Sequence, residues 1–146
     1  MYRMLGALAL GLLLSGCATQ YQSMGMTGGH ASGQGPGKLK RVVFAGNGYT
    51  KADLTQAYAK YRCAEMAQAN KKPFFIMYES LFAAAAERPS TTPRVGLVHN
   101  KPISTVFMLM LDAPRPGVLE TAVVLQELGP IVNGGPVASS TQGGTQ

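Results

Sequence analysis

The sequence predicts an α+β domain, because apolar residues recur with strand spacing in several short segments and with helix spacing in two longer ones. Hydrophobic residues make up 46% of the 146-residue chain and charged residues 14%, a balance typical of a folded protein. Both ends depart from this balance, since residues 18–37 are rich in Gly and residues 133–146 are mostly small or polar. We therefore expect one folded domain over residues 38–130, long enough for a single hydrophobic core.

The domain is expected to begin with a strand over residues 39–45, which are rich in β-branched and aromatic side chains. A turn with positive φ angles is predicted next, at Gly46, Asn47 and Gly48. A glycine-rich turn between a strand and a helix can hold phosphate, but neither the dinucleotide spacing nor the Walker lysine is present. A plain turn is the better interpretation.

A long helix is predicted over residues 51–70, which contain no Gly or Pro and much Ala. Its apolar residues recur three and four positions apart, at Leu54, Ala57, Tyr58, Tyr61 and Ala64. Thr50 is expected to cap this helix, with Asp53 three residues later in a weak form of the capping box. Cys63 and Met66 lie roughly opposite the apolar stripe, so both faces of the helix are expected to be covered.

Three further strands and a second helix complete the expected domain. The strands are residues 74–79, 92–98 and 103–111, with a helical turn over 81–87 and a hairpin turn at residues 99–102. Phe74, Ile76 and Tyr78 should share one face. The almost entirely apolar segment 103–111 should be a central strand covered on both faces.

The second helix is predicted over residues 118–128, ended by Gly129 and Pro130, and a strand over 121–125 is the alternative. The resulting order is β-α-β-β-β-α. It predicts a small, mainly antiparallel sheet of about four strands with two helices packed on one face.

The N-terminus is typical of an export signal. Arg3 precedes an apolar run over residues 4–14, which is too short for a bilayer span of about 20 apolar residues. Leu14, Ser15, Gly16 and Cys17 follow this run. These four residues resemble the lipobox of bacterial lipoproteins.

That resemblance implies a lipidated N-terminus. In such lipoproteins the Cys thiol receives a diacylglyceryl group, the signal is cut before the Cys, and the new amine receives a fatty acid such as palmitate. Residues 1–16 are then the cleaved signal peptide and Cys17 is the lipidation site. Three acyl chains hold a protein on a membrane almost permanently. An ordinary cleaved signal with an unmodified Cys17 is the alternative.

The resemblance also implies a localisation in the cell envelope. Ala18 stands where Asp marks retention in the inner membrane of enteric bacteria, so we expect the outer membrane, with the domain facing the periplasm. The inner membrane remains possible. Residues 17–37 are expected to form the lipidated Cys and a flexible tether reaching about 25 Å, and residues 131–146 a disordered tail.

The residues of the first strand, turn and helix also resemble a group of small proteobacterial lipoproteins. The resemblance covers residues 40–80 and rests on Phe44, the Gly46-Asn47-Gly48 turn, the Arg62-Cys63-Ala64-Glu65 segment and Phe75. The chain departs from the group at Lys72 and Pro73, where Gly and an aromatic residue are expected. The group has no assigned activity, so the resemblance implies a fold and an address but no functional residues.

Charge suggests a partner only in broad terms. The formal net charge is +6, and residues 38–72 hold eight Lys or Arg against Asp53 and Glu65. Membrane contact through the lipid anchor is expected, and an envelope protein or an anionic envelope polymer is a possible partner. Tyr49, Tyr58 and Tyr61 beside lysines could mimic a nucleic-acid surface. The export signal argues against a nucleic-acid partner.

The sequence contains no recognisable catalytic constellation, and we expect no cofactor, no metal and no enzymatic activity. His30 and His99 lie in the expected tether and hairpin turn, without metal-ligand spacing. A periplasmic enzyme remains an alternative if Tyr58, Arg62 and Glu65 converge in a cleft. We expect instead that Arg62 and Glu65 form a structural ion pair three residues apart.

A redox or stress sensor at Cys63 is the second alternative. Once Cys17 is acylated, Cys63 is the remaining thiol, so it cannot form an intramolecular disulfide. The neighbouring Arg62 could lower its pKa. A cysteine among alanines in a helix is more often a small core residue. The leading expectation is therefore a non-enzymatic envelope lipoprotein that acts through contacts with a partner.

Overall fold

A computed structural model of the chain describes residues 17–134, so the expected signal peptide and most of the expected tail lie outside the described residues. Within these residues the fold is α+β, with a mainly antiparallel sheet of six strands and three helices. The fold class is confirmed. The expected four strands and two helices are too few, because a strand before residue 38 and a two-residue strand were missed and the helical turn predicted over 81–87 forms a short helix at Leu81–Ala85.

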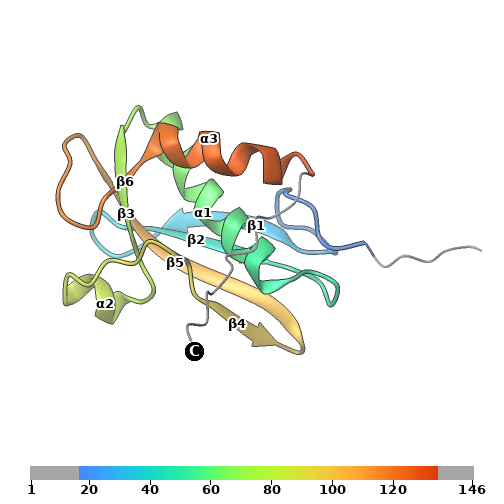
Figure 1. The fold of residues 1–146 in the computed structure, drawn as a ribbon. Helices are drawn as coiled ribbons and strands as arrows, with labels where there is room; N and C mark the ends of the chain where they lie inside the picture. The colour runs from blue at the N-terminus through green and yellow to red at the C-terminus, as the bar shows by residue number, and fades with distance from the viewer. Residues whose placement is uncertain (1–16, 135–146) are drawn as a thin grey trace, which may run out of the picture.

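The sheet is built around one long central strand. Its strands are β1 (Gly29–Gln34), β2 (Lys40–Ala45), β3 (Phe74–Tyr78), β4 (Val95–Val98), β5 (Lys101–Leu111) and β6 (Leu119–Glu120). The order is β1-β2-β5-β3-β6, and β4 pairs with the first residues of β5 (Figure 1). Met108 pairs with Lys40 of β2 on one side and with Met77 of β3 on the other. The prediction that 103–111 forms a central strand is confirmed.

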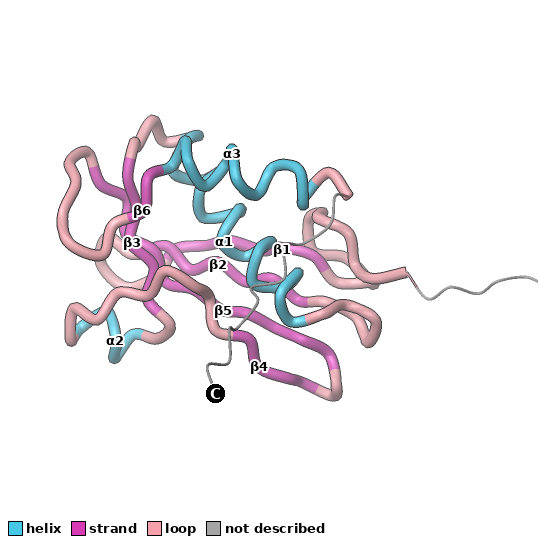
Figure 2. Tube along the Cα trace, viewed as in Figure 1, coloured by secondary structure: helices cyan, strands magenta, loops and turns pink. Residues whose placement is uncertain are grey.

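Two helices lie over one face of this sheet (Figure 2). Helix α1 (Ala52–Ala69) contacts β2, β3 and β5, and α3 (Thr121–Val132) packs along α1. Small buried residues of α1 allow this close approach on two sides, as expected for a helix covered on both faces. The core between these layers consists of Val42, Phe44, Tyr58, Ala59, Cys63, Ala64, Ala67, Phe75, Met77, Val106, Met108 and Val124.

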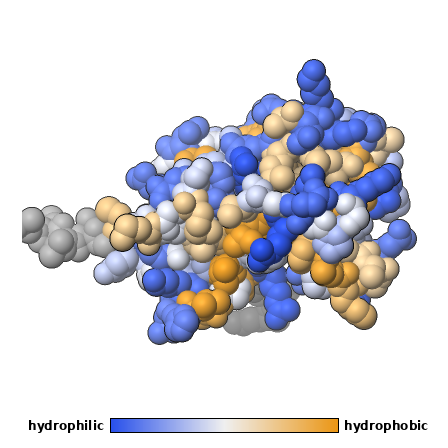
Figure 3. Space-filling view, turned by 180° about the vertical axis from the view of Figure 1, so that it is seen from behind, coloured by the Kyte–Doolittle hydropathy of each residue, from blue (hydrophilic) through white to orange (hydrophobic). Residues whose placement is uncertain are grey.

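The other face of the sheet is covered only in part. Ser104, Val106 and Met108 of β5 are buried under α1, whereas the alternate residues Phe107 and Leu109 are half-buried. The expectation that 103–111 is covered on both faces therefore holds fully for the face under α1 and only in part for the other. The described residues place only the five-residue helix α2 (Leu81–Ala85) and neighbouring loops on this side. Apolar side chains remain visible in the middle of the face in Figure 3.

The predicted tether is wrong for the segment that follows Cys17. Residues 29–34 form β1, which pairs with β2 through six residue pairs from Gly29 with Ala45 to Gln34 with Lys40. The glycines reflect close packing: a Cβ on Gly28 (φ 102°) would lie 2.2 Å from the Ala45 carbonyl oxygen. Glycine here permits a positive φ and a tight backbone contact, so it marks ordered structure instead of flexibility.

Helix ends also differ from the expectation. Lys51 is the N-cap of α1 and makes no side-chain capping bond, so Thr50 is not the cap. Helix α3 continues past Gly129 and Pro130 to Val132, which overturns both the predicted stop and the alternative strand. A proline late in a helix leaves one carbonyl, that of Gln126, without its helical donor. Gln126 is an exposed residue, so this carbonyl lies on a solvent-facing part of the helix.

The β4–β5 hairpin has a tighter turn than the predicted residues 99–102. His99 and Asn100 have φ angles of 50° and 59°, and Lys101 already belongs to β5. Two consecutive positive φ angles in a two-residue loop are the geometry of a type I′ turn. The turn projects His99 and Asn100 from the end of the sheet.

Candidate functional site

The first described residue, Cys17, lies directly against the folded domain. Its backbone carbonyl accepts a hydrogen bond from the side-chain amide of Asn47, at 2.8 Å. Two residues later, the Thr19 N–H donates to Thr50 Oγ1 at 2.9 Å, and the Thr19 side chain is 3% exposed. The chain thus joins the fold at once after the exposed Cys17.

The Gly46-Asn47-Gly48 turn is the receptor for this segment. Asn47 Oδ1 accepts hydrogen bonds from the Tyr49 N–H and the Thr50 hydroxyl, which fixes the amide group that reaches Cys17. Neither glycine has a positive φ, so the expected reason for them is wrong. A Cβ on Gly46 would lie 2.6 Å from Thr50 Cβ, so close packing requires glycine there, whereas a Cβ on Gly48 would meet no atom within 4 Å. Sequence reasoning placed this turn but gave Asn47 no role.

A second cluster holds the same segment farther along α1. The Tyr21 hydroxyl donates to the Glu65 carboxylate, and Arg62 Nη1 lies 3.2 Å from the same carboxylate oxygen. Arg62 Nε also donates to Ser32 Oγ of β1, at 3.2 Å. The predicted structural pair of Arg62 and Glu65 is confirmed, and it now has a purpose: it binds residues of the segment that was expected to be a tether.

Aromatic packing surrounds this cluster. The Tyr21 ring lies edge-on to Tyr58 and Tyr61, with centroids 5.4 and 5.3 Å apart, and 4.9 Å from His30. Burial and then the Glu65 carboxylate raise the pKa of Tyr21, so its hydroxyl remains a donor. Burial, with a contribution from Arg62, lowers the pKa of His30, which keeps the imidazole neutral.

The structure brings the suggested catalytic group of Tyr58, Arg62 and Glu65 together, but in a way that does not suit catalysis. The Glu65 carboxylate is already bound by Tyr21 and Arg62, and the Tyr58 ring lies between the rings of Phe44 and Tyr21. The cavities described below are lined by other residues. This arrangement favours a structural role over the periplasmic-enzyme alternative.

Cys63 also fits a structural role. The residue is fully buried in the core between α1 and its neighbours. Burial raises the pKa of the Cys63 thiol to about 12, against a smaller opposite effect of Arg62. Because the thiolate is the reactive form, this environment argues against the redox-sensor alternative.

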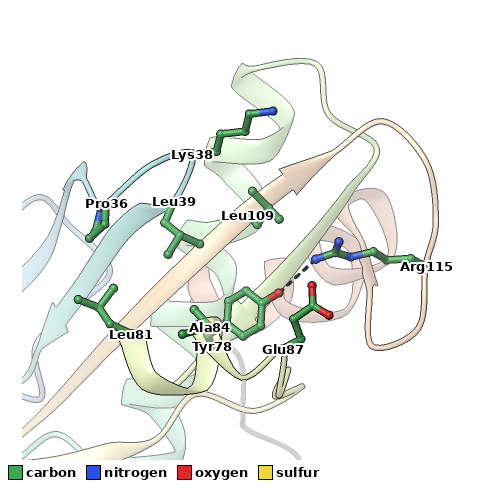
Figure 4. A pocket seen from close by; sticks show the side chains of 10 residues that line it. Pro36, Lys38, Leu39, Tyr78, Leu81, Ala84, Glu87, Leu109 and Arg115 are labelled. Carbon is green, nitrogen blue, oxygen red and sulfur yellow. Dashed lines mark hydrogen bonds between the residues drawn. The ribbon is translucent and has the colours of Figure 1, made fainter.

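The main concave site lies on the partly covered face of the sheet, under α2 (Figure 4). Its volume is about 480 Å³, and we call it the α2 groove. Its floor is formed by Tyr78 of β3 and Leu109 of β5, and its walls come from α2 and from the turn between β1 and β2. The lining residues are Pro36, Lys38, Leu39, Tyr78, Leu81, Ala84, Ala85, Glu87, Leu109 and Arg115.

The α2 groove is mostly apolar but has charged groups at its edge. Arg115 Nη2 donates to the Tyr78 hydroxyl at 3.2 Å, and the Glu87 carboxylate points toward these two groups in Figure 4. A second cavity of about 220 Å³ shares Tyr78, Glu87 and Arg115 and extends the groove beside Ile76. With Lys38 at the other end, two cations and one carboxylate line the rim, which suits an apolar ligand bearing a negative group.

The α2 groove and Cys17 lie at opposite ends of the molecule (Figure 1). Strand β2 connects them: Ala45 adjoins the turn that holds Cys17, and Lys40 adjoins the β1–β2 turn that lines the groove. Five residue steps along a strand span roughly 17 Å. The attachment point and the groove are therefore separated by the length of the sheet.

No sequence pattern indicates the α2 groove, because its residues come from five separate segments. Alternation in β3 placed Tyr78 on one face with Phe74 and Ile76, as the pairing confirms. A usable signal was the Gly-Pro-Gly at residues 35–37, which is typical of a turn and would have indicated a hairpin.

The histidines remain far apart. His30 lies in β1 against Tyr21, while His99 is exposed in the β4–β5 turn. Within residues 17–134, no group of three or more His, Cys, Asp or Glu is placed to hold a metal ion. No helix in that same range is long and apolar enough to cross a bilayer.

Comparisons with protein-family models, with curated proteins and with solved structures find no match to this chain.

Proposed function

We propose that this chain is a lipid-anchored envelope protein that acts as a non-enzymatic interaction module. In this proposal the Cys17 thiol receives a diacylglyceryl group, residues 1–16 are removed, the new amine is acylated, and the domain faces the periplasm. The observation that carries the proposal is the motif Leu14-Ser15-Gly16-Cys17 directly after the apolar run of residues 4–14. Cys17 is exposed, and its backbone carbonyl is bound by Asn47 of the domain.

The proposed membrane is the outer membrane. Ala18 follows the acylated residue, and it lacks the carboxylate of the Asp that marks inner-membrane retention in enteric lipoproteins. Resemblance to small proteobacterial lipoproteins supports the same address. Ala18→Asp should move the protein to the inner membrane in an enteric host, as fractionation of the two membranes would report.

The α2 groove is the proposed partner site, and a protein partner is its proposed occupant. The apolar floor at Leu109 and wall at Leu81 suit apolar side chains, which an anionic polymer lacks. Arg115 and Lys38 at the rim suit an acidic residue beside those side chains. Because the groove lies at the end opposite Cys17, an anchored domain keeps it accessible from the periplasm.

The anchor is tested by intact mass and membrane partition of the expressed wild-type protein beside Cys17→Ala. We expect the wild type to start at residue 17, carry the mass of three acyl chains and partition into membranes. Cys17→Ala should lack the acyl mass. Two soluble proteins that have both lost a signal would contradict the proposal and leave Cys17 as an unmodified thiol.

The groove is tested with the fluorescent probe anilinonaphthalene sulfonate, an apolar molecule with one negative charge. Leu81→Glu places a carboxylate in the wall and should weaken probe binding about tenfold, because the probe's sulfonate and rings are both disfavoured there. Leu97→Glu on the exposed surface of β4 is the matched control. Equal binding to both variants would show that the α2 groove does not hold an apolar anion.

A further inference from the structure

Exposed apolar side chains gather around Cys17 at the end of the molecule opposite the α2 groove. Met26 and Tyr49 are 105% and 67% exposed, and Met24 and Val98 are 45% and 50% exposed. These residues come from two loops and from the β4–β5 hairpin. We call the surface formed by Met24, Met26, Tyr49, Val98 and Lys101 the anchor face.

Hydrogen bonds link the two loops and the hairpin to residues 17–19, the segment that carries the proposed acylation site. Thr19 Oγ1 donates to the carbonyl of Thr27, next to Met26, and the Thr19 N–H donates to Thr50, next to Tyr49. The Gly46 N–H donates to the carbonyl of Pro102 at 2.8 Å, which joins the β4–β5 hairpin to the same end. In Figure 1 these segments lie at the end of the sheet where the blue start of the described chain lies, away from α2.

Basic groups accompany the apolar ones. Lys51 and Lys101 are exposed beside the 46–50 turn and at the hairpin, and His99 is exposed in the hairpin turn. Asp53, one turn into α1, is the acidic residue exposed nearby. Apolar side chains interspersed with lysines are the surface that enters the headgroup layer of a bilayer with anionic lipids.

The direct connection between Cys17 and the fold determines how close the anchor face must lie to the bilayer. No flexible residues separate Cys17 from the fold, because the Cys17 carbonyl itself is bound by Asn47. Acyl chains in the bilayer would hold Cys17 at headgroup depth, and loops bonded to the next residues must lie at nearly the same depth. Exposed methionine and tyrosine side chains would then be in the lipid instead of water.

We infer that the anchor face is a lipid-binding surface that lies in the headgroup layer and fixes the orientation of the domain, with the α2 groove directed away from the membrane. This inference rests on the proposed acylation of Cys17. The partner is a lipid surface that contains anionic headgroups. The domain is then a rigid, oriented platform, in place of the freely tethered one that the sequence suggested.

Tryptophan reporters test the inference, because the chain contains no Trp. Full-length acylated Tyr49→Trp is reconstituted in phosphatidylcholine–phosphatidylglycerol vesicles with and without brominated acyl chains. Phe82→Trp, on α2 at the opposite end and 72% exposed, is the matched control. We expect at least about twofold quenching of Tyr49→Trp by brominated lipid and almost none of Phe82→Trp, since quenching requires contact with the acyl region.

Met26→Trp, in a different loop, provides an independent reporter and should be quenched like Tyr49→Trp. Intact mass of each sample separates the two proposals. Acylated protein whose reporters on the anchor face are quenched no more than Phe82→Trp would overturn the orientation and leave the lipid anchor standing. Absence of acyl mass would overturn both.

Discussion

The side-chain amide of Asn47 and the backbone carbonyl of Cys17 are joined by a 2.8 Å hydrogen bond that spans thirty positions of sequence. The bond holds the proposed acylation site against a turn between β2 and α1. Asn47 is itself fixed by two further hydrogen bonds, from Tyr49 and Thr50. The proposed anchor and the folded domain are thus coupled with no spacer.

Replacing Asn47 should loosen this coupling without unfolding the domain. Asn47→Ala removes the hydrogen bond to Cys17 together with those from the Tyr49 N–H and the Thr50 hydroxyl. An exposed hydrogen bond is worth about 1 kcal/mol, so loss of the bond to Cys17 alone should accelerate amide exchange over residues 18–28 at least about fivefold. Hydrogen exchange with mass detection measures this. Asn70→Ala, which removes a 2.8 Å bond to the Met66 carbonyl at the far end of α1, is the control and should leave those residues unchanged. Equal exchange in both variants would contradict a holding role for Asn47.

Removal of the Tyr21 hydroxyl should destabilise the domain. Tyr21→Phe deletes the donor to the Glu65 carboxylate but keeps the aromatic contacts, so the free energy of unfolding should fall by about 1 kcal/mol. Denaturant titration at neutral pH measures this. Tyr49→Phe, at an exposed phenol, should change the free energy little. A tether that did not pack on α1 would give the same stability for both variants.

The same hydroxyl should make stability depend on alkaline pH. Burial and the Glu65 carboxylate raise the pKa of Tyr21 above that of the unfolded chain, so this contribution is complete below about pH 10 and declines as pH rises above it. Denaturant titrations at neutral pH and near pH 10.5 measure the decline. It should be smaller in Tyr21→Phe than in the wild type. Parallel curves would show that Tyr21 ionises as freely in the folded state as in the unfolded one.

Cys63 should be protected from thiol reagents in the folded protein. Its pKa of about 12 and its complete burial leave neither thiolate nor access, so in full-length, unacylated Cys17→Ser the labelling rate should follow global unfolding. The control is Cys63→Ala, also prepared without acylation, in which the exposed Cys17 should react rapidly. Rapid labelling of Cys63 without denaturant would restore the redox-sensor hypothesis.

Glycine at position 71 should stabilise the C-terminal end of α1. Lys71 has a φ of 57°, and the Lys72 and Lys71 N–H groups donate to the carbonyls of Ala67 and Gln68. This is the Schellman arrangement, in which glycine avoids the strain of a left-handed backbone. Lys71→Gly should raise the free energy of unfolding by about 0.5–1 kcal/mol in denaturant titrations, and Lys71→Ala should not. A loss of stability with glycine would contradict the assigned geometry.

The elements between residues 39 and 111 could be predicted because their signals are local. Alternation in 74–79, the long Ala-rich repeat of 51–70 and the apolar run of 103–111 each extend over several residues and agree with the structure. Local patterns did not predict the structure of the segment after Cys17. β1 has the sequence Gly-His-Ala-Ser-Gly-Gln, which carries no apolar alternation, and it forms because β2 offers a free edge.

The groove and the anchor face were beyond sequence reasoning for a related reason. Tyr78, Leu109 and Arg115 lie in different elements, and the chain gives no local sign that they meet. Met26 lies in the expected tether and Val98 in a predicted strand, and only the hydrogen bonds of Thr19 and Gly46 place their segments beside Cys17.

By itself the sequence determined the α+β class, the central strand, the long helix and the expectation of an acylated Cys17, because each depends on a pattern of neighbouring residues. Tertiary structure alone decided that residues 19–34 belong to the fold, that Tyr21 binds Glu65, and that the groove lies a sheet length from Cys17. The physical reason is that these features depend on contacts between segments distant in the chain, whose energies no local pattern encodes.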